Sequence, residues 1–65
     1  MSDSKDKEAR NLALMISSIC RTSRTAKQKV KEVIKINLLE AGFSEELSEK
    51  ESTKCFEDFW AVDQT

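Results

Sequence analysis

The 65-residue chain contains no proline, histidine or tyrosine, and it has one glycine and two cysteines. The lack of turn-forming residues argues against a β fold rich in turns, and abundant Lys, Glu, Leu, Ile and Ala favour helix. Without histidine, a Gly-rich loop or a Cys/His pair, the usual nucleophile–base sites are missing. Cys20 and Cys55 lie too far apart, without histidine, for a zinc signature. We therefore predict a helical protein that is not an enzyme and has no metal, cofactor or small-molecule substrate.

Long apolar runs are also missing. The stretch LALMISSIC at 12–20 follows the charged KDKEAR, but it is too short and too polar at Ser17 and Ser18 for a signal peptide. No segment approaches the length needed to cross a membrane. We predict an intracellular, cytoplasmic protein without membrane contact, the nucleus being the other compartment considered. Cys20 and Cys55 are then reduced thiols that line the core, with a bridge between them as the alternative.

The length bounds the organisation to one small domain, residues 1–65, with a frayed start at 1–3. A chain this short buries only about 60% of the surface that its unfolded form exposes. Small scaffolds compensate with disulfides, metals, regular helix packing or oligomerisation. The last two routes fit this composition, so we expect a homodimer or a subunit of a larger complex.

The clearest element is a helix over 25–42. Thr25 and Gln28 have the spacing of a capping box at its start. Gly42 stands where a helix end favours a left-handed residue, and Phe43 follows where a Schellman motif places its hydrophobic contact. Between these signals the sequence contains neither proline nor glycine.

Two further helices flank this one, over about 4–22 and 44–62. Asp3 or Ser4 can cap the first, and Ser44 can cap the last. The last segment is either one helix or two with a break at Ser52–Thr53. The short polar connector after the first helix predicts an antiparallel hairpin. The fold class is therefore all-α, a small three-helix bundle or a helical hairpin plus a C-terminal helix. The helical periodicity predicts this core: Leu12, Ile16, Ile19, Val30, Val33, Ile34, Leu38, Phe43, Leu47, Phe56, Phe59 and Trp60.

Charge is segregated along the chain. Residues 1–44 carry nine Lys/Arg and five Asp/Glu, a net +4, whereas residues 45–65 carry two Lys and seven Asp/Glu, a net −5. The basic part includes a stretch that a nucleic-acid-binding regulator would use: Arg21, Arg24, Lys27, Lys31 and Lys35. This function is the second choice, because the stretch has no base-reading face and the whole chain is slightly acidic.

The first choice is a protein–protein interaction module, a small subunit, adaptor or inhibitor that presents a helical surface to a protein partner or to itself. Ile36 and Leu39 lie off the main apolar stripe of the central helix, so they form a second apolar strip that predicts a partner surface.

A third hypothesis uses the acidic-aromatic C-terminus CFEDFWAVDQT as a ligand for a partner groove, through Phe56, Phe59, Trp60 and Val62. Phe56 and Trp60 are four residues apart with acids around them, which is similar to the helix-in-groove peptides of acidic activation domains. Glu57-Asp58-Phe59-x-x-Val62 resembles the short acidic-aromatic motif of autophagy receptors, which adds a strand to a partner sheet. Packing of the aromatic cluster into the core is the favoured interpretation.

Overall fold

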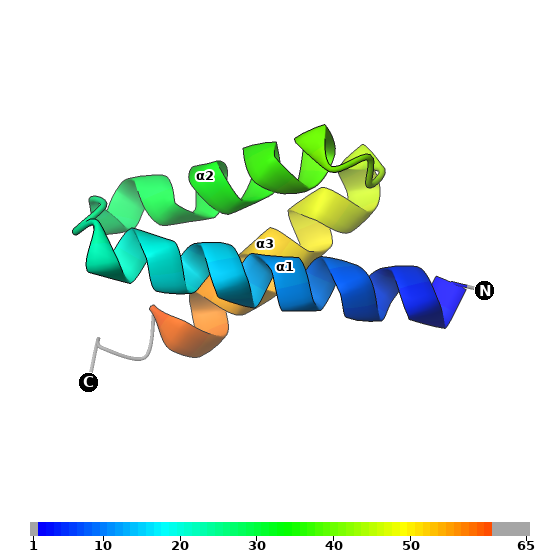
Figure 1. Cartoon of the computed structure of the whole chain (residues 1–65), viewed down its shortest axis with the longest axis horizontal. Helices are drawn as coiled ribbons and strands as arrows, with labels where there is room; N and C mark the ends of the chain where they lie inside the picture. The colour runs from blue at the N-terminus through cyan, green and yellow to red at the C-terminus, as the bar shows by residue number, and fades with distance from the viewer. Residues whose placement is uncertain (1, 61–65) are drawn as a thin grey trace.

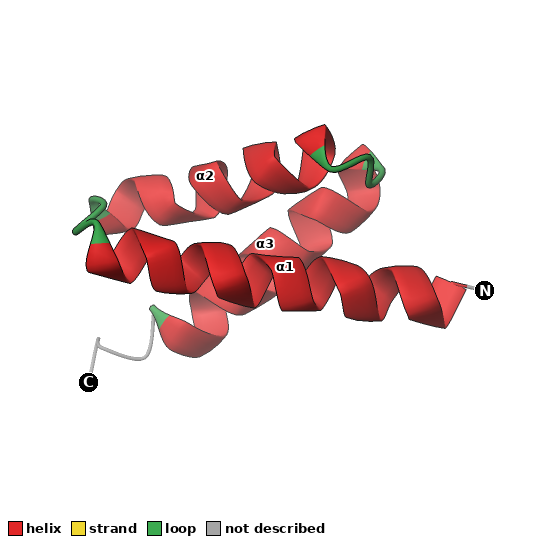
Figure 2. Ribbon diagram, viewed as in Figure 1, coloured by secondary structure: helices red, strands yellow, loops and turns green. Residues whose placement is uncertain are grey.

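The computed structural model describes the chain from residue 2 to residue 60, and within that range it holds three helices and no strand (Figure 2). These are α1 (Ser2–Thr22), α2 (Lys27–Glu40) and α3 (Glu45–Phe59). The all-α three-helix bundle is confirmed. Helix α3 is continuous through Ser52–Thr53, which decides between the two organisations considered for this segment. No described helix combines the length and the apolar character that a membrane crossing requires.

Helices α1 and α2 form an antiparallel hairpin, and α3 crosses behind α1 in Figure 1. Contacts between α1 and α3 follow the same order along both helices. Arg10 meets Glu51, and the Cys55 thiol donates to the Ala13 carbonyl at 3.8 Å. One turn later, Trp60 Nε1 donates to Ser17 Oγ at 2.8 Å. The third helix therefore runs in the same general direction as the first and closes the bundle on one side of the hairpin.

The end of α2 has the predicted geometry. Gly42 has a φ of +104°, its N–H donates to the Leu39 carbonyl, and the Phe43 N–H donates to the Leu38 carbonyl. These two bonds define a Schellman motif, and Phe43 packs against the core as the accompanying hydrophobic contact. Ser44 then caps α3, with its hydroxyl accepting from the Leu47 N–H at 3.2 Å.

The end of α1 repeats this geometry without a glycine. Arg24 has a φ of +59°, its N–H donates to the Arg21 carbonyl, and the Thr25 N–H donates to the Cys20 carbonyl. Thr25 thus belongs to the cap that ends α1. The predicted capping box at Thr25 and Gln28 is wrong, because α2 has Ala26 at its N-cap and no side-chain capping bond there.

The first helix also begins earlier than predicted. Since α1 starts at Ser2, Asp3 and Ser4 lie within the helix and do not flank it as caps. The residues predicted for the last helix beyond residue 60, Val62 among them, lie outside the described range.

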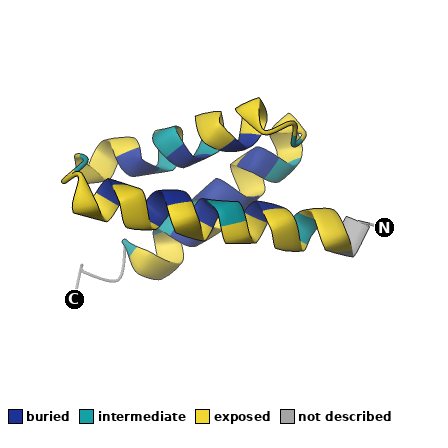
Figure 3. Ribbon diagram, in the orientation of Figure 1, coloured by how far each residue is buried: buried dark blue, intermediate teal, exposed yellow. Residues whose placement is uncertain are grey.

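The predicted core is largely confirmed, with two corrections (Figure 3). Ile16 of α1 is buried, as are Val30, Ile34 and Leu38 of α2. Six other predicted residues are partly buried and pack against these: Leu12, Val33, Phe43, Leu47, Phe56 and Trp60. The predicted burial of Ile19 and Phe59 is wrong, because their side chains are 56% and 47% exposed. Ala9, Ala13 and Cys20 are buried on α1 instead, because its packed face is centred on small residues that let a neighbouring helix approach closely. On α3, Trp60 packs against α1 just beyond the helix, and Phe59 stays in solvent.

The inner face of α3 is unexpectedly polar. Its buried residues are Ser48, Glu51, Ser52 and Cys55. The Ser52 hydroxyl donates a hydrogen bond to the Glu49 carbonyl of the same helix, at 3.0 Å. Cys20 and Cys55 are both buried and unbridged. No large apolar side chain of this helix is fully buried, in contrast to Val30, Ile34 and Leu38 of α2.

Candidate interaction surface

Helix α1 carries large apolar side chains on the side that faces away from α3. Ser17 marks the side toward α3, because it bonds to Trp60. Met15 and Ile19 stand two positions before and after Ser17, which is about 200° around the helix. They therefore point nearly opposite to α3, and they are 61% and 56% exposed.

Helix α2 shows the same arrangement. Lys31 and Lys35 mark its side toward α3, since their Nζ atoms lie 3.5 and 2.8 Å from the Glu49 carboxylate. Val33, two residues from each lysine, is on the opposite side. Ile36, three residues after Val33, is its neighbour on the helix surface and is 46% exposed.

Because α1 and α2 are antiparallel neighbours, these side chains belong to one surface of the hairpin. We call it the α1–α2 face; it comprises Leu12, Met15, Ile19, Val33 and Ile36. Leu12 and Val33 are half-buried against the core, while Met15, Ile19 and Ile36 are exposed to solvent. Apolar side chains that gather on one surface mark interaction sites more often than isolated exposed residues do. The exposed polar residue Asn37, one turn after Val33, also lies on this side of α2.

The two ends of the α1–α2 face differ in charge. Lys5 of α1 stands 6.0 Å from the centre of the Phe43 ring, so the start of α1 lies beside the end of α2. Glu8 and Glu40 occupy this end by helical spacing, four residues before Leu12 and four after Ile36, so the end holds two acids against the one base Lys5. Lys29 occupies the other end, four residues before Val33. All of these charged side chains are exposed.

Ile36 and Leu39, the predicted apolar strip, are both exposed and are neighbours three residues apart on α2. Ile36 contributes to the α1–α2 face. Leu39 follows Lys35 by one turn and so lies on the flank of α2 nearer α3. The use of this pair as a partner site stays a prediction. Met15 was not among the predicted site residues. The sign that could have indicated a second surface is the width of the apolar arc from Leu12 to Cys20, which exceeds a single packed stripe.

The acidic-aromatic cluster is divided between core and surface. Phe56 is half-buried against the core, and Trp60 is fixed by its bond to Ser17, with the Arg21 guanidinium 5.5 Å from its ring centre. Among the three aromatic residues of this cluster, Phe59 alone is exposed. Val62 lies outside the described range, and the peptide-ligand hypothesis stays a prediction.

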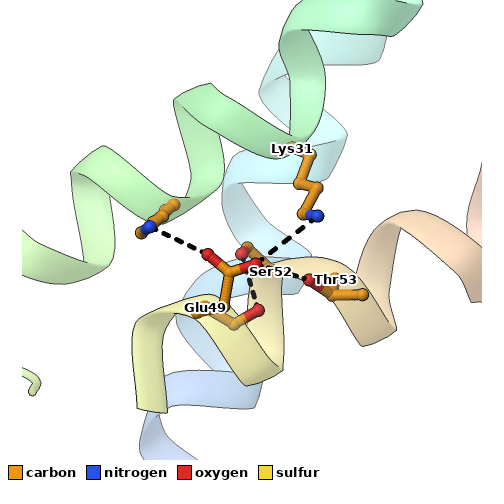
Figure 4. Close-up of polar contacts among 5 residues, drawn as sticks. Lys31, Glu49, Ser52 and Thr53 are labelled. Carbon is orange, nitrogen blue, oxygen red and sulfur yellow. Dashed lines mark hydrogen bonds and ion pairs between the residues drawn. The ribbon is translucent and has the colours of Figure 1, made fainter. Parts of the chain in front are cut away.

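The basic stretch is also divided. Figure 4 shows Lys31 of α2 directed at Glu49 of α3, and Lys35 makes the shorter contact with the same carboxylate. The hydrogen bond to Glu49 raises the pKa of Lys35 above its ordinary value. The same bond, then the charges of Lys35 and Lys31, lower the pKa of Glu49. These groups therefore serve contacts between helices, while Arg24 and Lys27 stay exposed near the connector. Their role in nucleic-acid binding stays a prediction.

Within residues 2–60, no three His, Cys, Asp or Glu side chains come together in a way that would hold a metal ion. The sequence matches no protein-family model, and no curated protein and no solved structure is significantly similar to the chain.

Proposed function

We propose that this protein is a non-enzymatic protein–protein interaction module that associates with a second copy of itself through the α1–α2 face. The observation that carries the proposal is the exposure of Met15, Ile19 and Ile36 on one side of the hairpin, while α3 covers the other side. A second hairpin placed there would complete a four-helix arrangement of a kind that buries apolar faces in helical proteins.

Charge favours one orientation of the second copy. A two-fold axis that lies in the interface and runs perpendicular to the helices brings the acidic end of one face over the basic end of the other. Lys29 then approaches Glu8 and Glu40 of the other copy, and the same pairing occurs twice. A parallel arrangement would instead place like charges together, which is unfavourable.

Sedimentation velocity across a concentration series from low micromolar to millimolar tests the proposal. We expect dimers at the upper end and a melting temperature that rises with concentration, since association stabilises the folded state by mass action. Ile36→Lys should give a monomer. Leu14→Lys is the matched control, because it puts the same charge in place of an apolar side chain that is 39% exposed on the flank of α1 beside α3, away from the α1–α2 face.

A wild-type chain that stays monomeric throughout the series, with a melting temperature independent of concentration, would overturn the proposal. Equal effects of the two lysine substitutions would also count against this face. Lys29→Glu tests the orientation: it should weaken the dimer, and the weakening should diminish as added salt screens surface charge.

A further inference from the structure

A narrow groove separates α1 and α3 on the flank of the bundle. It consists of two adjoining cavities of about 190 and 180 Å³ that share Leu14 and Phe59 in their linings. The first cavity is also lined by Glu51, by Arg10, Lys54 and Asp58, and by Cys55. We call this first cavity the Glu51 pocket. Its volume equals that of about six water molecules at ~30 Å³ each, enough for one long side chain.

Glu51 is an unusual lining residue because it is 1% exposed and incompletely paired. Its Oε1 lies 3.6 Å from Arg10 Nε, a long contact made by a side chain that is itself 53% exposed. Its Oε2 accepts no hydrogen bond from any described residue, and the nearby buried Ser48 hydroxyl on the same inner face is also unpartnered. A buried carboxylate requires good pairing to offset the loss of hydration. Arg10 alone provides an incomplete partner.

The residues around Glu51 indicate which chemical group would complete the pairing of its carboxylate. Leu14 and Phe59 supply apolar walls and are both partly exposed at the mouth of the groove. Asp58 adds a second acid, while Lys54 and Arg10 supply two bases at the same lining. A guanidinium suits this setting better than an ammonium. Its planar N–H groups can pair with both oxygens of one carboxylate, and its flat face can stack on an aromatic ring.

We propose that the Glu51 pocket binds an arginine side chain presented by a partner protein. The guanidinium pairs with Glu51, its aliphatic stem lies against Leu14, and its plane lies on Phe59. Because Glu51 is only 1% exposed, the Arg10 side chain, whose Nε lies 3.6 Å from one carboxylate oxygen, swings outward and opens the carboxylate to the guanidinium. This site lies on the opposite flank of α1 from Met15 and Ile19, so the proposal does not depend on self-association.

The test is an NMR titration of the isotope-labelled full chain with N-acetyl-arginine methylamide. N-acetyl-citrulline methylamide, which has nearly the same shape without the charge, is the matched control. We expect saturable shifts at the amides of Leu14, Cys55 and Phe59. Citrulline should bind at least about tenfold more weakly, the scale set by a charge-assisted hydrogen bond.

Glu51→Gln should abolish the preference for arginine over citrulline, and Glu57→Gln, which removes one charge from the exposed surface of the same helix, should leave it unchanged. Phe59→Ala alters an exposed side chain and should weaken arginine binding without unfolding the chain. Equal binding of the two ligands to the wild type, or an arginine preference that survives Glu51→Gln, would overturn the proposal.

Discussion

Replacing Arg24 by glycine should stabilise the protein. Arg24 has a φ of +59° at the end of α1 and an exposed side chain. For an L-residue, the left-handed conformation costs about 1–2 kcal/mol. Glycine avoids that cost but loses about 0.5–1 kcal/mol more backbone entropy on folding. The expected net gain therefore lies between zero and about 1.5 kcal/mol. Each 1 kcal/mol raises the melting temperature by about 4–8 °C for a domain of this size.

Thermal unfolding followed by far-UV circular dichroism measures this change, with all variants at one protein concentration. Arg24→Ala is the control, because it removes the same side chain but keeps the Cβ, and it should show no comparable gain. Gly42→Ala examines the reverse change at the end of α2, where φ is +104° and a Cβ would meet nothing within 4 Å. Its destabilisation would then be a purely backbone effect. If Arg24→Gly melts at or below the temperature of Arg24→Ala, the assignment of strain to this residue is refuted.

Two further predictions concern titratable groups. The pKa of Glu49 is lowered in the folded chain, so its contribution to stability is present at neutral pH and is lost as pH falls through that pKa. The free energy of unfolding, measured with urea, should therefore fall less at acid pH for Glu49→Gln than for the wild type. An unchanged acid dependence would show that other carboxylates dominate. Burial raises the pKa of the Cys55 thiol, and a hydrogen bond with Ser17 lowers it by a smaller amount. Cys55 should therefore react with iodoacetamide far more slowly in the native state than in urea. Rapid native labelling, located by mass spectrometry, would contradict its burial.

The sequence predicted the fold because its helix signals are local. Gly42 and Phe43 specify the end of α2 through backbone geometry that few residues other than glycine adopt readily. Ser44 specifies the start of α3 by a single side-chain bond. Periodicity alone selected the buried residues of α2, which faces both other helices and carries a regular apolar stripe.

The failures arise where neighbouring elements decide the outcome. Thr25 has the capping-box spacing, but its N–H is already used to end α1. Ile19 is apolar and in phase, but the packed face of α1 is centred on alanines, so the isoleucine is left outside. Glu51 has the composition of a surface residue and becomes buried only because α1 and α3 cross at that point. Both candidate interaction surfaces depend on these pairings, and neither was predicted in its present form.

The polar inner face of α3 has a consequence for how the fold opens. The fully buried side chains of α3 are small or polar, and Leu47 and Phe56 pack only partly against the core. We therefore expect the free energy that holds this helix to the hairpin to be smaller than that of α2. Amide hydrogen exchange should therefore rank the helices: α3 protons exchange through a local detachment, whereas those around Ile34 await global unfolding. In that detached form the hairpin would expose both of its long sides at once, which makes α3 the element whose departure governs access to the interior of the protein.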